Sequence, residues 1–173
     1  NVIYDDNHQE VTIEMEVKMP KDQEVQIYYT QREKQQYNKD LHLSIPVKGS
    51  QEFQKLVFTM ASDTLIRRIR IDFGDIALED CAIKEMTIRH FDREIIVSPQ
   101  EMFKWFEPNR FIDSMRVQDN ALRFNTTGID PFFKLLDNND LIDRYNELSV
   151  YRQKTYFAFF FCSFFLFLEN SGF

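Results

Sequence analysis

Side chains alternate between apolar and polar along several stretches of the first two thirds of the chain, and this pattern restricts the fold more than any other feature. It is clearest at residues 11–18, where apolar residues occupy every second position without a break. Because successive side chains of a β-strand point to opposite faces, this segment predicts a strand with one buried and one solvated face. Similar alternation at residues 25–29 and 41–47 indicates antiparallel sheets with a wet side.

Further segments with strand character follow at short intervals, separated by turn residues. They are residues 53–60, 65–73, 83–91 and 94–97, and a hairpin of residues 115–118 and 121–125 that turns at Asp119-Asn120. About nine strands with short turns favour a mainly β fold, which we expect to be an antiparallel β-sandwich of the jelly-roll type. Pro46 lacks a backbone N–H and therefore predicts an edge position, or the strand's end, within residues 41–47.

One short helix is expected to interrupt the strands. Residues 98–101 (Ser-Pro-Gln-Glu) have the sequence of a capping box with proline at the first helical position, and Pro108 is expected to end the helix. A second helix is expected after the potential caps at residues 138–140, because apolar side chains recur there at helical spacing. These side chains are Leu141, Ile142, Tyr145 and Leu148. We therefore expect a β-sandwich domain over residues 1–137 and a helical C-terminal segment over residues 138–173.

The C-terminal segment contains a phenylalanine-rich run at residues 156–168, with 13 uncharged residues of which seven are phenylalanine. A helix that is apolar all round needs a buried or lipid environment. Thirteen helical residues rise about 20 Å, against about 30 Å for the hydrocarbon core of a bilayer. We expect a juxtamembrane helix that runs into a membrane segment, or into the start of one. Its membrane residues would include Tyr156, Phe160, Phe164 and Leu168. The alternative is a hydrophobic element that packs on the domain or on a partner protein.

The composition excludes several functional classes. Acidic residues exceed basic ones by 28 to 21, so the net charge of −7 argues against a nucleic-acid partner. With only four glycines, a glycine-rich phosphate loop is not expected. Two cysteines and three scattered histidines give neither a disulfide framework nor a zinc site. No nucleophile motif is present either, so we expect a non-catalytic protein without an organic cofactor.

Calcium is a separate case, because carboxylates in loops are suitable oxygen ligands and β-sandwiches often carry one structural calcium ion. The candidate ligands are Asp5, Asp6, Asp75 and Asp80. The alternative is that these side chains belong to solvated acidic loops, since they do not have the spacing of a calcium-binding loop.

A first candidate binding feature is the basic face of residues 65–73. On a strand, Arg68 and Arg70 share a face with Asp72, so the two guanidinium groups could hold an anionic ligand. The alternative is a solvent-facing row whose arginines pair with acids such as Glu85 and Asp92.

A second candidate is aromatic. Alternation places Tyr28 on the face opposite to Val25 and Ile27, and Tyr37 lies in the polar loop that follows. Aromatic rings exposed on a β-sandwich are suited to stack on the C–H groups of a pyranose, so the two tyrosines are a candidate platform for sugar. The alternative is ordinary cross-strand packing of the rings.

Three stretches also resemble a known group of domains. They are VQIYYT (25–30), RRIRIDFGD (67–75) followed by CAIKEMTI (81–88), and LRFNTTGIDPFF (122–133). Together they resemble jelly-roll accessory domains of the galactose-binding-like or carbohydrate-binding-module type, which occur in bacterial membrane proteins of cell-surface polysaccharide and glycosyltransferase systems. The resemblance covers about residues 11–133. It implies a domain outside the cytoplasmic membrane that is followed by an apolar helix, and it implies no catalytic residues.

We therefore expect an extracytoplasmic binding or scaffolding module of a bacterial membrane protein, with carbohydrate as the candidate ligand at Tyr28, Tyr37, Arg68 and Arg70. The alternative is a protein–protein assembly domain whose phenylalanine-rich tail docks a partner and which has no small ligand. Orientation stays open at this point, because basic residues stand only before the apolar run, which favours a cytosolic domain.

Overall fold

The computed structural model describes residues 10–61, 66–90, 93–137 and 139–147. Within these ranges the chain forms eleven strands, a short helix α1 and a second helical segment at residues 141–147. In chain order the labelled elements are β1 (Glu10–Lys18), β2 (Gln23–Thr30), β3 (His42–Val47), β4 (Gln54–Ala61), β5 (Arg68–Asp72), β6 (Leu78–His90), β7 (Arg93–Val97), α1 (Pro99–Trp105), β8 (Phe106–Pro108), β9 (Ile112–Gln118), β10 (Ala121–Thr126) and β11 (Phe132–Leu135).

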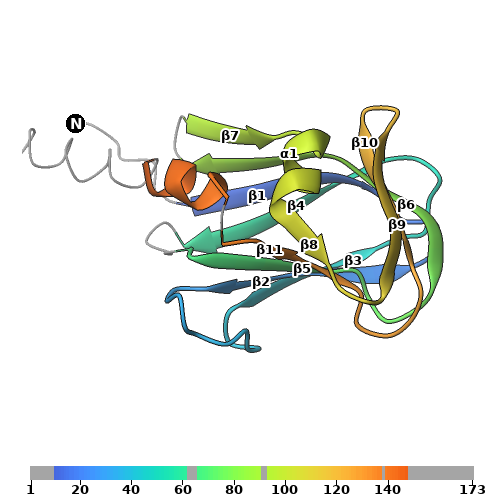
Figure 1. Cartoon of the computed structure of the whole chain (residues 1–173), viewed down its shortest axis with the longest axis horizontal. Helices are drawn as coiled ribbons and strands as arrows, with labels where there is room; N and C mark the ends of the chain where they lie inside the picture. The colour runs from blue at the N-terminus through green and yellow to red at the C-terminus, as the bar shows by residue number, and fades with distance from the viewer. Residues whose placement is uncertain (1–9, 62–65, 91–92, 138, 148–173) are drawn as a thin grey trace, which may run out of the picture.

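The strands form two sheets in which every pairing is antiparallel. Sheet A has the order β4-β1-β6-β10-β9, with β7 beside β6, and sheet B has the order β3-β2-β5-β11-β8. Figure 1 shows the two sheets as separate layers, with β1, β4 and β7 in one and β2, β3 and β5 in the other. The prediction of a mainly β fold with antiparallel sheets is therefore confirmed.

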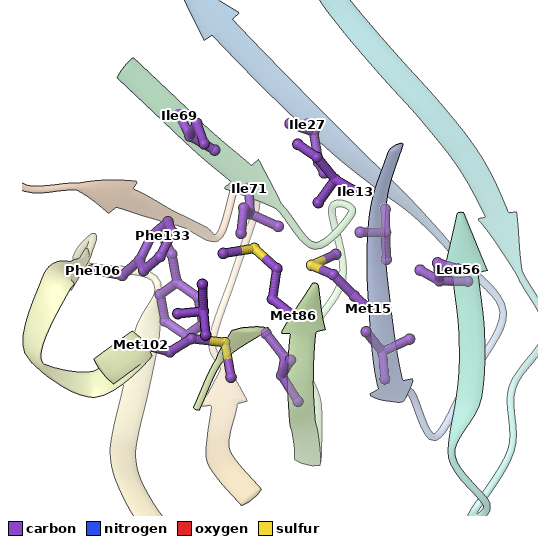
Figure 2. Packing of buried hydrophobic residues seen from close by; sticks show 14 of the residues in the cluster. Ile13, Met15, Ile27, Leu56, Ile69, Ile71, Met86, Met102, Phe106 and Phe133 are labelled. Atoms are coloured by element: carbon purple, nitrogen blue, oxygen red, sulfur yellow. The ribbon is translucent and has the colours of Figure 1, made fainter. Parts of the chain in front are cut away.

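The core lies between the two layers and is built from the apolar positions of the alternating strands. Met15 of β1 stands between Leu56 of β4 and Met86 of β6 in the register of sheet A. Ile27 and Ile71 of sheet B pair with each other and point into the same buried cluster. Figure 2 shows the side chains of both sheets meeting in this space. Period-two alternation therefore identified the buried faces, because each strand contributes one face to the shared core.

An aromatic cluster joins the two layers within the core. Phe73, which follows β5, Phe124 of β10 and Phe133 of β11 are each at most 1% exposed. The centroids of their rings lie 4.8–5.0 Å apart, with the planes tilted or edge-on. This geometry is favourable for aromatic pairs, and it ties a strand of sheet A to two segments of sheet B.

Sheet B differs from the sequence-based expectation at its far edge. The helix α1 ends at Trp105 instead of Pro108, because Phe106 adopts an extended backbone (φ −108°, ψ 131°) and starts β8. Strand β8 pairs with β11, and neither strand was predicted. At the opposite edge the expectation for Pro46 is confirmed, since β3 is the outer strand of sheet B.

The C-terminal helical segment at residues 141–147 packs on the sheets. Asn139 accepts hydrogen bonds from the backbone N–H groups of Leu141 (2.9 Å) and Ile142 (3.2 Å) and so caps the helix. Leu141 and Tyr145 belong to the buried core cluster. Further along the chain, the predicted membrane residues Tyr156, Phe160, Phe164 and Leu168 lie outside the described residues. In the part of the chain that is described, no helix has the length and apolar character needed to cross a membrane.

The capping box predicted at the start of α1 is formed in full. The Ser98 side chain accepts from the Glu101 backbone N–H, and the Glu101 carboxylate accepts from the Ser98 backbone N–H at 2.8 Å. Replacing Ser98 with alanine is expected to lower the free energy of unfolding by about 1 kcal/mol, because loss of the cap leaves an N–H group of the first turn unsatisfied. Urea unfolding of the full chain measures this. The control Gln100→Ala changes an exposed residue of the same turn, and an equal loss in both variants would argue against the cap.

Candidate functional site

The outer face of sheet B carries polar and aromatic side chains in register across its strands. Tyr28 of β2 stands opposite His42 of β3 on one side and Arg70 of β5 on the other. One row further along, Gln26 stands between Ser44 and Asp72. Because these positions alternate with the buried Val25, Ile27, Ile69 and Ile71, the same alternation that builds the core also creates this outer polar surface.

A cleft of about 660 Å³ lies on this face. Its floor comes from β2 and β5, and three loops form its walls: residues 37–39, 74–75 and 129–130. The lining consists of Gln23, Glu24, Gln26, Tyr28, Tyr37, Asn38, Lys39, Arg70, Asp72, Gly74, Asp75, Ile129 and Asp130. Three of the four residues predicted to bind a ligand, Tyr28, Tyr37 and Arg70, are therefore brought together in one cleft.

Gly74 allows one of these walls to approach the floor. Its φ of +78° lies in the left-handed region, and a Cβ atom built there would fall 1.7 Å from Oε1 of Gln23. The wall at residues 129–130 is fixed by Asn109, which donates from Nδ2 to the carbonyl oxygen of Asp130 at 2.7 Å. Asp130 itself adopts a positive φ of 62°.

Arg70 is the centre of the charge network in the cleft. Its Nε and Nη2 donate to the two carboxylate oxygens of Asp72 at 2.7 and 2.6 Å, and Nη2 also donates to Asp130. The guanidinium lies 3.7 Å from the ring centroid of Phe132. The side chains of Arg70 and Asp72 are 21% and 9% exposed. Such a bidentate, partly buried pair has a defined geometry, and it leaves Arg70 with its charge already compensated.

Burial has opposite effects on the two partners. It raises the pKa of the Asp72 carboxyl, and this effect, to which the charge of Asp130 adds, exceeds the lowering by the hydrogen bonds and charge of Arg70. For Arg70, burial lowers the pKa, but the hydrogen bonds and charges of Asp72 and Asp130 outweigh it and raise the pKa overall. The arginine is thus held in its charged form within the cleft.

Tyr28 contributes its hydroxyl and ring edge instead of a free ring face. Its ring stacks on His42 with centroids 5.3 Å apart and 20° between the planes, while Arg70 lies 5.6 Å from the ring centroid on the other side. The hydroxyl donates to Oε1 of Gln26 at 3.0 Å, and Nε2 of Gln26 donates to Glu24 at 2.9 Å. These bonds orient a chain of polar groups along the floor of the cleft.

Arg68, the fourth predicted residue, is not part of the lining. Its Nη1 donates to the carbonyl oxygens of Glu33 (3.3 Å) and Gln35 (3.4 Å), and its guanidinium lies 5.1 Å from the ring centroid of Tyr37. Arg68 therefore holds the loop after β2 and so places Tyr37 at the cleft. Burial raises the pKa of the Tyr37 hydroxyl, which is kept in its neutral form.

Glu85 and Asp92 are the acids that the sequence offers as alternative partners of the arginines. Glu85 lies on β6 of the other sheet, and Asp92 lies outside the described residues. The partners of Arg70 are instead Asp72 and Asp130. Sequence reasoning missed Asp130 because 60 residues separate it from Arg70. It missed Gln26 too, although the alternation that selected Tyr28 places Gln26 on the same face.

Two of the four candidate calcium ligands, Asp75 and Asp80, belong to the described residues. Asp80 forms ion pairs with Lys18 and with Arg123, the latter at 2.7 Å, and Asp75 lines the cleft. Asp5 and Asp6 lie outside the described residues. No group of three or more His, Cys, Asp or Glu side chains suited to a metal ion occurs in the described part of the chain.

Cys81 of β6 belongs to the buried core cluster. It is 0% exposed, and burial raises the pKa of its thiol to about 12. A thiol in that environment is a small apolar side chain and not a nucleophile.

Comparison of the chain with protein-family models, curated proteins and solved structures finds no match. What the cleft binds is therefore inferred from its own side chains.

Proposed function

We propose that this chain is a non-catalytic binding module of the jelly-roll class, and that the cleft on sheet B holds a saccharide. The cleft carries the proposal, because it gathers planar polar side chains, two tyrosines and a fixed Arg70–Asp72 pair on one sheet face. Planar amide, carboxylate and guanidinium groups suit the neighbouring hydroxyl groups of a sugar ring, since each can donate or accept at two points.

Two features of the cleft suit a polyhydroxylated ligand. Its polar groups are already oriented by one another, as in the series of hydrogen bonds from Tyr28 to Gln26 to Glu24, so binding costs little ordering of side chains. In addition, Ile129 is 68% exposed at the rim and offers an apolar surface to the C–H face of a sugar. The jelly-roll assignment is supported by the repeated crossing of the chain between the sheets from β3 to β4, β5 and β6.

Calorimetric titration of the full chain with a panel of bacterial envelope oligosaccharides tests the function. We expect at least one saccharide to bind, and replacement of Tyr37 with alanine to weaken it about tenfold, equivalent to about 1.4 kcal/mol. The matched control is Phe53→Ala, which removes an exposed aromatic side chain (38% exposed) outside the cleft. Absence of binding across the panel, or unchanged affinity in Tyr37→Ala, would count against the saccharide site.

The cellular setting stays a prediction. The composition of the phenylalanine-rich run at residues 156–168 and the resemblance described above support a module held at a bacterial cell membrane, with the β domain on the outer side. Membrane fractionation of the full chain tests the attachment, and protease accessibility in intact cells tests the side. If the full chain forms a defined soluble oligomer without detergent, the run acts as a protein interface and the assembly-domain alternative is favoured.

A further inference from the structure

The charges that line the cleft are unequal. Four carboxylates, Glu24, Asp72, Asp75 and Asp130, face two cationic groups, Lys39 and Arg70. The difference of 2 − 4 gives a formal charge of −2 for the lining. Because fields in a cleft are focused by its low-dielectric walls, this excess acts strongly on a bound ligand.

Arg70 does little to offset the excess for an incoming anion. Its Nε and Nη2 donors are directed at Asp72 and Asp130. A ligand carboxylate would have to displace one of these acids, or share the guanidinium with two negative charges already in place. Arg68 and Arg70, which the sequence offered as binding groups for an anion, are thus engaged by groups of the protein itself.

Two of the four carboxylates have no cationic partner among the residues that the structure describes. Glu24 accepts from the neutral groups Gln26 Nε2 (2.9 Å) and Ser44 Oγ. Neither Glu24 nor Asp75 forms an ion pair with any residue that the structure describes. Both line the same cleft, so an ammonium group bound there would meet carboxylates that no described cation neutralises.

Resting on the saccharide-binding function proposed above, we propose that the ligand carries protonated amino groups, as an oligosaccharide of glucosamine does, and that saccharides with carboxylate or phosphate groups are rejected. An ammonium group gains charge-assisted hydrogen bonds to Glu24 or Asp75. The sugar hydroxyl groups meet Gln23, Gln26 and Asn38, which are neutral. A carboxylate in the same position meets like charges and loses hydration without a compensating partner.

Three oligosaccharides of matched length test the inference on the full chain: one of glucosamine, one of N-acetylglucosamine with the same linkage, and one of glucuronic acid. At pH 6 and low salt we expect the glucosamine oligosaccharide to bind about tenfold more tightly than its acetylated counterpart, and the glucuronate not to bind. The preference should shrink in 0.5 M salt, because screening weakens the charge term (Debye length roughly 4 Å) and leaves the hydrogen bonds to hydroxyl groups.

Variants separate this preference from general attraction to an acidic protein. Asp75→Asn is expected to remove most of the preference for the amino sugar. The control Asp143→Asn removes one charge from an exposed residue outside the cleft and should leave the preference unchanged.

Equal binding of the amino and acetylated sugars, or tight binding of the glucuronate, would overturn the charge inference and leave the saccharide function standing. If spermidine at equal charge competes with the amino sugar, and Tyr37→Ala leaves the affinity for the sugar unchanged, the preference is only ionic attraction to an acidic surface. Absence of binding by every saccharide would overturn both proposals.

Discussion

Replacing Phe124 with alanine is expected to lower the free energy of unfolding by about 3–5 kcal/mol. The side chain is 1% exposed and contacts both Phe73 and Phe133, at centroid distances of 4.8 Å each. Alanine removes the apolar surface that Phe124 buries, and it leaves a cavity at the point where strands of the two sheets meet. The two remaining rings stay 5.0 Å apart, so the neighbours have little freedom to fill that cavity.

Chemical unfolding of the full chain, followed by circular dichroism, measures the loss. Phe103→Ala is the control, because Phe103 lies on α1 and is 47% exposed. We expect that control to cost less than about 1 kcal/mol. A loss of the same size in both variants would show that the aromatic cluster does not join the sheets as described.

Replacing Arg70 with methionine is expected to cost about 3 kcal/mol at pH 7. The Asp72 side chain is 9% exposed and would then hold its charge without the bidentate partner. Methionine keeps an unbranched apolar side chain in place of the guanidinium, which lies 3.7 Å from the ring centroid of Phe132. The figure is below the upper range for buried pairs because the Arg70 side chain is 21% exposed and partly screened by water. The double variant Arg70→Met with Asp72→Leu should recover most of the loss, since it removes the stranded charge as well.

The pH dependence of the same variant has a defined sign. Burial raises the pKa of Asp72 above its ordinary value of 3.8, and without Arg70 nothing opposes that effect apart from water. A carboxyl whose pKa is raised on folding binds its proton more readily in the folded state, so stability falls as the pH rises through the window from 3.8 up to the raised pKa. The cost of Arg70→Met should therefore be larger at pH 7 than at pH 4.

Arg123 provides the matched control for this variant. Its side chain is 20% exposed, similar to Arg70, but its partners Asp80 and Asp119 are 51% and 65% exposed. Arg123→Met leaves those carboxylates in water, so we expect a loss of about 1 kcal/mol or less and little change between pH 4 and pH 7. A pH-independent loss in Arg70→Met would indicate that packing, and not the charge of Asp72, stabilises this part of sheet B.

The sequence predicted those parts of the fold that depend on local periodicity. Alternation in β1, β2 and β5 identified both the core residues and the outer positions of Tyr28 and Arg70, because side-chain direction in a strand repeats every two residues. The capping box at Ser98 was equally readable, since its two bonds join residues three apart. Strands β8 and β11 were missed because three and four residues are too few to show a period.

The site was only partly predictable, for a different reason. Residue type and direction selected Tyr28 and Arg70, yet the charge state of the cleft depends on Asp130, which reaches Arg70 across 60 residues of sequence. The same residue type and direction also selected Arg68, which shares a strand face with Arg70. Backbone carbonyl groups of the loop after β2, however, bind its guanidinium. Long-range contacts of this kind determine the electrostatics of the cleft and the role of each side chain near it. No local pattern in a single sequence reveals them.

The two borders of sheet B have a consequence for how copies of this protein behave when crowded. Pro46 interrupts the outermost strand on one border, and β8 on the other border is three residues long and ends in Pro108. A proline has no N–H to offer, so neither border presents an unbroken ladder on which a neighbouring chain could continue the sheet. Even at high local concentration, these molecules should therefore remain discrete and not polymerise edge to edge through the sheet that carries the cleft.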